Sequence, residues 1–256
     1  MDLDDVKILL NRTQLKINKR WLKRRIDTSG SLNENRDLHG RFCANPFKQL
    51  DVYEGGKAYS CCSNWLPTSI GKISNTAIMD VWNSTASQKI RGSILDGSFK
   101  YCDHKVCPMI QNDSLPTLDE ARLDPTNQQI IDQQTLILDE PPSYINLCND
   151  ASCNLYCPSC RRSKINYAKG RKFESRKHIQ DLIKTQLFAE PSDRHFSINV
   201  TGSGDPFASA VFRDFLFNLN GADFPNLAIH LQTNGVLLTP RNWQRMHKIQ
   251  NNIDTI

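Results

Sequence analysis

The 256-residue sequence lacks any apolar run as long as the ~18–20 residues that a membrane-spanning helix requires. Its first five residues include three aspartates, whereas a secretory signal begins with basic and then apolar residues. There is no internal repeat, no phosphate-binding P-loop, no His-Glu-x-x-His motif and no nucleophile elbow, and Gly202-x-Gly204 lacks the third glycine of the dinucleotide fingerprint. These absences argue against the common nucleotide-binding and hydrolase sites and predict a cytoplasmic protein.

Neither positive nor negative charge is in large excess, because the formal net charge is only +5. Much of the basic excess lies near the N-terminus, where we expect a helix within residues 1–40. Its basic residues alternate with apolar ones and are Arg12, Lys16, Lys19, Arg20, Lys23, Arg24 and Arg25. Such a helix can bind nucleic acid or a membrane surface, or it can pack its Leu/Trp stripe on the protein and leave its charges in water. We expect the second arrangement.

Cysteine, by contrast, is abundant, with nine residues that cluster at short spacings. In a reducing compartment such clusters favour metal binding over disulfides. Cys153, Cys157 and Cys160 have the spacing C-x3-C-x2-C directly after the strand-like residues 144–147. A structural zinc ion needs four protein ligands, whereas three thiolates can hold three irons of a cubane cluster and leave the fourth iron open. A zinc knuckle completed by Cys148 or by a distant histidine remains the alternative.

A strand and a glycine-rich turn follow the three cysteines. Residues 196–200 alternate apolar and polar side chains, which predicts a strand. The turn at residues 201–206 then leads into a helix-like segment at residues 207–219. Glycines at the end of a strand let the backbone approach a ligand closely, although an ordinary strand–helix loop has the same composition.

A further strand is predicted at residues 227–232, and it ends in Thr233-Asn234-Gly235. Asn-Gly often forms a hairpin turn, but Thr239-Pro240 is typical of a helix start and predicts a helix at residues 241–249. Repeated strand–helix units predict a parallel sheet, whose ligands bind at the carboxyl ends of the strands. All three motifs fall at those ends.

Together these motifs resemble those of the radical S-adenosylmethionine (SAM) superfamily. The cysteine run is similar to the superfamily's cluster motif, residues 202–206 are similar to its Gly-Gly-Glu-Pro region, and Thr-Asn-Gly is common at the end of its third strand. The sequence departs from the pattern at three positions. Ser159 stands where an aromatic residue usually contacts the adenine of SAM, Ser203 replaces a glycine, and Asp205 replaces the usual acid.

The resemblance implies that Cys153, Cys157 and Cys160 hold a 4Fe-4S cluster whose open iron is chelated by the amino and carboxylate groups of SAM. Reductive cleavage of SAM would give a 5'-deoxyadenosyl radical that abstracts hydrogen from a substrate. Residues of the two later loops would hold SAM, namely Gly202, Ser203, Gly204, Asp205, Thr233 and Asn234. The first four would contact the amino group, and the last two would lie near the ribose or methionine part.

The N-terminal half also contains several cysteines. Gly55-Gly56 predicts a hairpin turn with Cys61 on its second arm, and Cys61 and its neighbour Cys62 would point to opposite faces of a strand. The order of elements resembles the SPASM/twitch domain, an auxiliary iron–sulfur domain of many radical SAM enzymes. The resemblance implies an auxiliary 4Fe-4S cluster with four ligands, Cys43, Cys61, Cys102 and Cys107. Four such thiolates could also hold zinc.

We therefore predict an α/β protein with four segments. A basic N-terminal segment (residues 1–40) and a small cysteine-rich α+β auxiliary domain (41–112) precede a linker (113–142) and a partial radical SAM barrel (143–256). In the superfamily the auxiliary domain normally follows the barrel. The barrel would comprise about three and a half strand–helix units, because residues 253–256 resemble the start of a fourth strand. Its remainder would be missing or supplied by another chain.

The expected function is that of a radical SAM enzyme, with a flavodoxin- or ferredoxin-type protein as reductant and a peptide or protein as substrate. Nucleic acid is not an expected partner. Two alternatives remain open. One is a zinc-bearing module that binds nucleic acid through the basic helix, and the other is a non-catalytic iron–sulfur protein that transfers electrons or serves as a scaffold.

Overall fold

The computed structural model describes residues 36–256, so the basic residues of the expected N-terminal helix lie outside the described range. The described residues belong to two units. The main unit comprises Leu38–Asp103 and Leu115–Ile256. The small unit contains, of the described residues, 36, 37 and 104–114.

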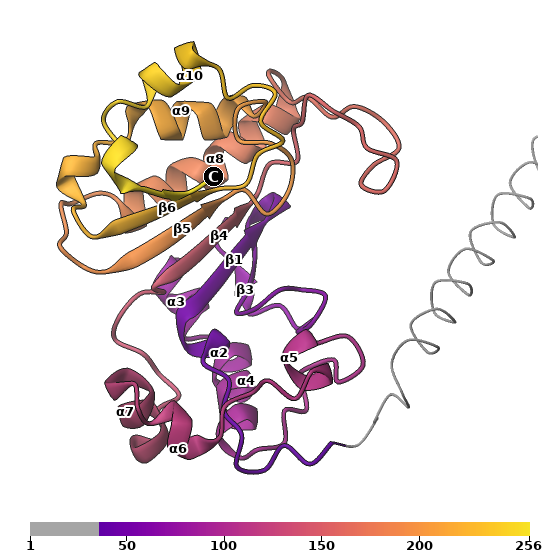
Figure 1. The fold of residues 1–256 in the computed structure, drawn as a ribbon, viewed down its shortest axis with the longest axis vertical. Helices are drawn as coiled ribbons and strands as arrows, with labels where there is room; N and C mark the ends of the chain where they lie inside the picture. The colour runs from indigo at the N-terminus through magenta and orange to yellow at the C-terminus, as the bar shows by residue number, and fades with distance from the viewer. Residues whose placement is uncertain (1–35) are drawn as a thin grey trace, which may run out of the picture. The chain divides into compact units, whose positions relative to one another are not determined.

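Within the described residues, the main unit is built on a seven-stranded sheet with the order β3-β2-β1-β4-β5-β6-β7 (Figure 1). The strands are β1 (Gln49–Tyr53), β2 (Lys57–Tyr59), β3 (Gly71–Lys72), β4 (Tyr144–Cys148), β5 (Phe196–Val200), β6 (Leu227–Leu231) and β7 (Ile253–Thr255). Strands β1, β4, β5, β6 and β7 run parallel, whereas β2 and β3 are antiparallel to their neighbours. The chain is thus a mixed α/β protein with a mostly parallel sheet.

Three strand–helix units follow one another from β4 onward, as the sequence predicts. The helices that follow β4, β5 and β6 are α8 (Arg171–Leu187), α9 (Ala210–Asn218) and α10 (Pro240–Arg245). Helix α10 begins where expected, because the Thr239 hydroxyl accepts a hydrogen bond from the backbone N–H of Asn242 at 3.3 Å. Strand β6 pairs in parallel with both of its neighbours, so the alternative of a hairpin at Asn234-Gly235 is wrong.

The first three strands join the sheet in an unexpected way. The hairpin predicted at Gly55-Gly56 is confirmed, with the turn Glu54–Gly56 between β1 and β2. Strand β1 also pairs in parallel with β4 along its whole length. The segments predicted as an auxiliary domain and as a barrel therefore share one sheet. The physical reason is that Leu50 and Val52 of β1 are fully buried and extend the apolar face of β4.

Residues 113–142, predicted as a linker, contain two short helices, α6 (Leu118–Ala121) and α7 (Pro125–Gln133). Thr117 and Glu120 form a capping box at the start of α6. The carboxylate of Asp124 accepts from the backbone N–H groups of Thr126 and Asn127 at 2.9 and 3.0 Å, which caps α7. The segment predicted as a linker therefore forms helices whose starts are capped by its own side chains.

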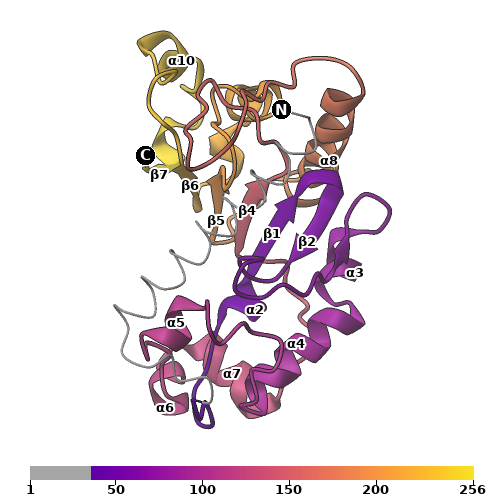
Figure 2. The same cartoon turned by 90° about the vertical axis from the view of Figure 1, so that its right-hand side faces the viewer.

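The remaining helices are short. The main unit contains α2 (Asn45–Lys48), α3 (Ile78–Trp82) and α4 (Thr85–Leu95), and Figure 2 shows α2, α4 and α7 gathered near the amino end of β1. The small unit contains α5 (Pro108–Gln111), where Arg36 Nη1 donates to the carbonyl oxygen of Ile110 at 2.9 Å. No helix within residues 36–256 combines the length and the apolar composition that crossing a membrane would require.

The two faces of the sheet differ in chemistry. Strands β5 and β6 alternate buried with half-buried residues, and Ile198 and Ile229 share one core cluster with Ile183 of α8 and Phe212 of α9. Figure 1 shows α8, α9 and α10 on one side of β4, β5 and β6. Most of the alternate positions carry polar side chains that point to the other side, which we call the open face; they include Asn146, Ser197, Asn199 and His230. Because parallel sheets are usually covered by apolar contacts on both faces, a polar face suggests a site for a ligand.

Candidate iron–sulfur and cofactor site

The three cysteines of the C-x3-C-x2-C motif lie in the loop that joins β4 to α8. Cys153 is half-buried, Cys157 and Cys160 are exposed, and all three thiols are free. The backbone N–H of Cys160 donates to the carbonyl oxygen of Cys157 at 2.9 Å, and that of Cys153 donates to Ile165 at 2.8 Å. The loop follows the carboxyl end of β4, and two of its three cysteines, Cys157 and Cys160, are exposed to solvent.

The loops after β5 and β6 meet this loop through one buried residue, Asp205, which uses both its carboxylate and its backbone. Its Oδ2 accepts from the Thr233 hydroxyl at 2.7 Å and from the backbone N–H of Asn234 at 2.9 Å. Its own backbone N–H donates to the carbonyl oxygen of Ser152, next to Cys153, at 2.9 Å. The structure therefore brings together the three loops in which the sequence predicted cluster and cofactor residues.

Asp205 is buried, unlike the other residues predicted to hold SAM. The sequence predicted that this carboxylate contacts the amino group of SAM. In the structure it is fully buried, and Oδ1 also accepts from the backbone N–H groups of Phe207 and Ala208 at 3.0 and 3.2 Å. Four protein donors saturate the carboxylate, so Asp205 orders the loops and offers no free oxygen to a ligand. The Thr233 hydroxyl is likewise engaged inside the protein.

Asn234 connects the third loop to the cysteines directly. Its Nδ2 donates to Asn154 Oδ1 at 2.9 Å and lies 3.7 Å from the sulfur of Cys153. Arg161 Nη2 lies 3.5 Å from the sulfur of Cys160. Hydrogen bonds to cysteine sulfur also tune the reduction potential of an iron–sulfur cluster.

The predicted close approach of the glycine backbone is also present. Gly204 has a φ of +83°, and a Cβ atom at this position would lie 2.5 Å from the carbonyl oxygen of Ser152. A Cβ on Gly202 would collide with the sulfur of Cys148. Only glycine therefore lets this turn pack against the base of the cysteine loop. Ser203 lies between them, and its hydroxyl donates to the carbonyl oxygen of Cys148 at 3.2 Å.

Sequence reasoning did not identify Asp150, whose carboxylate accepts hydrogen bonds from the start of the cysteine loop. Asp150 is fully buried and accepts from the backbone N–H and the hydroxyl of Ser152 at 3.0 and 2.9 Å, and from the Ser209 hydroxyl at 2.6 Å. Arg176 of α8 lies 3.5 Å from it. The signal in the sequence is the Asp-x-Ser order directly after a strand, which is typical of a local side-chain turn.

The four cysteines predicted for an auxiliary cluster are divided between the units. Cys43, Cys61 and Cys102 belong to the main unit, and Cys107 precedes α5 in the small unit. Burial, with a smaller contribution from the nearby Cys43, raises the pKa of the Cys61 thiol to about 12. Metal binding at Cys61 would therefore have to displace a tightly held proton. Strand β2 ends at Tyr59, so the strand-face argument for Cys61 and Cys62 does not apply.

The donor chemistry of the cysteine loop fits a 4Fe-4S cluster, since it offers three free thiols on one loop with hydrogen-bond donors beside two of them. Within residues 36–256, no three His, Cys, Asp or Glu side chains are already grouped closely enough to hold a metal ion. Cluster binding would therefore require the thiols of residues 153–160 to converge.

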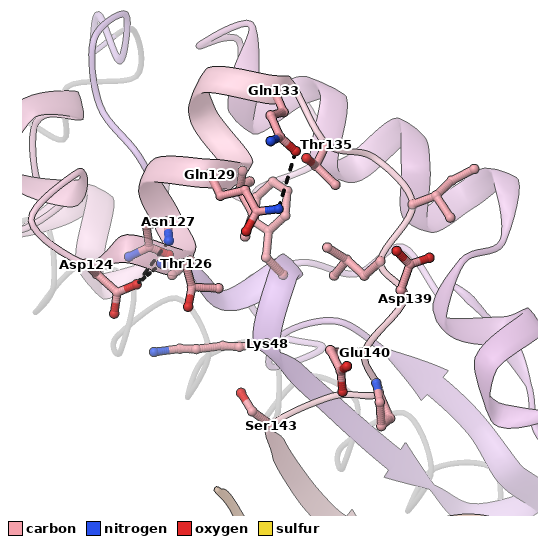
Figure 3. Close-up of a pocket in the computed structure, with 16 residues that line it drawn as sticks. Lys48, Asp124, Thr126, Asn127, Gln129, Gln133, Thr135, Asp139, Glu140 and Ser143 are labelled. Carbon is pink, nitrogen blue, oxygen red and sulfur yellow. Dashed lines mark hydrogen bonds between the residues drawn. The ribbon is translucent and has the colours of Figure 1, made fainter. Parts of the chain in front are cut away.

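A separate cavity of about 450 Å³ lies between α7 and residues 135–143 (Figure 3). Lys48, Asp124, Asp139 and Glu140 contribute charged groups to it. Asp124 is engaged in capping α7, and Gln129 donates to Gln133 at 3.4 Å along the helix. None of its lining residues belongs to the three motifs, so this cavity is not part of the candidate site.

Residues 43–108 match the family model of SPASM, an iron-sulfur cluster-binding domain. The match includes β1, β2 and β3 and all four cysteines predicted for the auxiliary cluster. SPASM domains are typical of radical SAM-associated proteins, so the match supports iron–sulfur cluster binding by this segment. Searches of the curated proteins and of the solved structures found no match.

Proposed function

We propose that this chain is a radical SAM enzyme-type protein in which Cys153, Cys157 and Cys160 hold a 4Fe-4S cluster. When bound, the cluster and SAM supply a one-electron cleavage that yields methionine and a 5'-deoxyadenosyl radical, which takes a hydrogen atom from the substrate. The observation that carries the proposal is the junction of the three loops through Asp205 at the carboxyl ends of β4, β5 and β6. Ligands of parallel strand–helix folds bind at these ends.

The residues of the chain would act by positioning. The backbone of Gly202, Ser203 and Gly204 lies against the base of the cysteine loop and would bind the amino group of SAM. Asn234, with its amide beside Cys153, would orient the methionine or ribose part. Asp205 would keep both loops in register without touching the cofactor. Ser159 offers no ring for the adenine, so the base would be bound by other groups.

The matched SPASM segment would hold an auxiliary 4Fe-4S cluster through Cys43, Cys61, Cys102 and Cys107. We further propose that β4 to β7 are the first strands of a partial barrel whose interior is the open face. A flavodoxin- or ferredoxin-type protein would supply the electron, and a peptide or protein is the proposed substrate. The auxiliary cluster would relay electrons or stabilise the fold.

Anaerobic reconstitution with iron and sulfide tests the proposal. Two 4Fe-4S clusters would give about eight irons and eight acid-labile sulfides per chain. The EPR signal of the reduced protein should change when SAM is added, and 5'-deoxyadenosine should accumulate with a reductant. Bound zinc without acid-labile sulfide would overturn the proposal in favour of a zinc module. Two clusters whose signals ignore SAM would instead indicate a non-catalytic iron–sulfur protein.

A further inference from the structure

The open face carries a row of polar side chains that the proposed chemistry does not use. The strand register places Asp51 of β1, Asn146 of β4 and Asn199 of β5 side by side. Asn199 Nδ2 donates to Asn146 Oδ1 at 2.9 Å, and Asn146 Nδ2 donates to Asp51 Oδ2 at 3.2 Å. All donors in the row point toward Asp51, because a carboxylate can only accept. The row thus has a fixed direction and ends on a negative charge.

This row lines a broad cavity of about 1010 Å³ on the open face. Three aromatic side chains line the same cavity, Tyr53, Tyr144 and Trp65. The pKa values of both tyrosines are raised, mainly by burial and partly by the nearby charge of Asp51. Aromatic rings and a carboxylate are therefore gathered around one space.

Asp51 has no cationic partner among the described residues. Its carboxyl group is buried, with the residue only 1% exposed, and it accepts from Gln49 Nε2 at 2.7 Å in addition to Asn146. Lys48, the one described lysine or arginine that lines the cavity, is exposed and forms no ion pair with Asp51. Burial raises the pKa of Asp51 more than the two hydrogen bonds lower it. A buried charge without a counter-charge is unfavourable, and a cation supplied from outside would remove that cost.

We propose that this cavity binds the cationic group of a substrate, an amine or a guanidinium, beside the carboxylate of Asp51. The half-buried Gln49 amide now donates to that carboxylate, and the incoming cation would replace it. The aromatic rings would stabilise the same positive charge. The side-chain oxygen Oδ1 of Asn199 would accept a further hydrogen bond from the cation. The identity of the reaction rests on the proposed function, whereas the binding preference does not.

Binding of two small probes to the full chain, reconstituted anaerobically, tests this inference. Nα-acetyl-L-arginine amide carries the cation, and Nα-acetyl-L-citrulline amide is its neutral isostere. Calorimetry or the fluorescence of the Trp residues should show the arginine probe binding about tenfold or more tightly than the citrulline probe. Asp51→Asn should abolish that preference while the variant stays folded. Asp181→Asn, which makes the same charge change on α8, should preserve it.

Equal binding of the two probes, no binding of the arginine probe, or a preference that survives Asp51→Asn would overturn the inference. The result is independent of the proposed function. A cation preference in a protein that does not cleave SAM would reject radical chemistry alone. SAM cleavage without a cation preference would reject only the assignment of Asp51.

Discussion

The guanidinium of Arg176 lies 3.5 Å from the carboxylate of Asp150. Nη2 of the same side chain lies 2.6 Å from Glu54 in the turn between β1 and β2, and its guanidinium carbon sits 3.8 Å above the ring of Tyr167. One side chain of α8 therefore contacts both the SPASM-matched hairpin and the residue that holds the cysteine loop. Arg176 and Asp150 are 2% and 0% exposed, so this pair lies away from water, whereas the Glu54 side chain is exposed.

Arg176→Met should strongly destabilise the fold. It leaves the buried carboxylate of Asp150 without its cation, and breaking a buried pair in this way costs about 3–5 kcal/mol. Glu54→Gln is the matched comparison, because the Glu54 side chain is 66% exposed and its loss should cost at most ~1 kcal/mol. Urea unfolding of both variants measures the difference. Equal losses of stability in the two variants would contradict the larger contribution expected from the buried Arg176–Asp150 pair.

Gly204→Ala should be more harmful than Gly235→Ala. Both glycines have positive φ, +83° and +77°, so both variants carry backbone strain. Only at Gly204 would the new Cβ meet neighbouring backbone, whereas nothing lies within 4 Å at Gly235. We expect Gly204→Ala to lower the free energy of unfolding by about 1–3 kcal/mol more than Gly235→Ala. Similar losses in thermal and urea unfolding would contradict the close approach to Ser152.

Asp205→Asn should weaken SAM binding about tenfold and leave the iron content unchanged. An amide cannot accept all four of the present hydrogen bonds, so the loops bearing Thr233 and Asn234 would lose their common anchor. Equilibrium binding of SAM and iron analysis on the same sample separate the two effects. Asp223→Asn, in the turn Gly221–Asp223, is the control. Unchanged SAM affinity in Asp205→Asn would refute the positioning role.

Cys157→Ala and Cys102→Ala should each remove one cluster and spare the other. Each variant should retain about four of the eight irons expected for the reconstituted chain. Only Cys157→Ala should also lose the effect of SAM on the EPR signal, because only this residue belongs to the proposed SAM-binding loop. A full complement of iron in either variant would contradict the ligand assignment.

Asp51→Asn should stabilise the fold at neutral pH. Burial, the largest influence, raises the pKa of Asp51 above 3.8, the ordinary value that it would have in the unfolded chain. Between these two values the folded state binds more protons than the unfolded state, so the free energy of unfolding falls as the pH rises through this window. The amide variant removes this loss. Urea unfolding at acidic and neutral pH, with Asp181→Asn as the control, should show a gain for Asp51→Asn only at the higher pH. A loss of stability at neutral pH would contradict the unpaired carboxylate.

Much of the site could be predicted because its signals are local in the sequence. The strands at residues 196–200 and 227–231 follow from the alternation of apolar and polar side chains, and Thr239-Pro240 marks the start of α10. Parallel strand–helix units then place the loops that follow them at one edge of the sheet. The sequence alone therefore predicts that the cysteine, glycine and Thr-Asn loops lie close together.

The features that escaped prediction depend on residues distant in the sequence. The pairing of β1 with β4 joins Asp51 to Asn146, and nothing near either residue specifies the other. The ion pair between Arg176 and Asp150 likewise depends on how α8 packs against the sheet. The hydrogen bonds of Asp205 were not predicted either, because sequence shows that an acid follows a glycine and not how many backbone donors will surround it.

The pairing of β1 with β4 also has a consequence for how this protein can be divided. Strand β1 supplies the main-chain partners for one edge of β4, along all five residue pairs from Gln49–Tyr144 to Tyr53–Cys148. A fragment that began at residue 143 would present that edge unpaired, and exposed strand edges recruit other chains. Removal of the SPASM-matched segment is therefore expected to make the remaining strands prone to edge-to-edge association, because β1 would no longer cover β4.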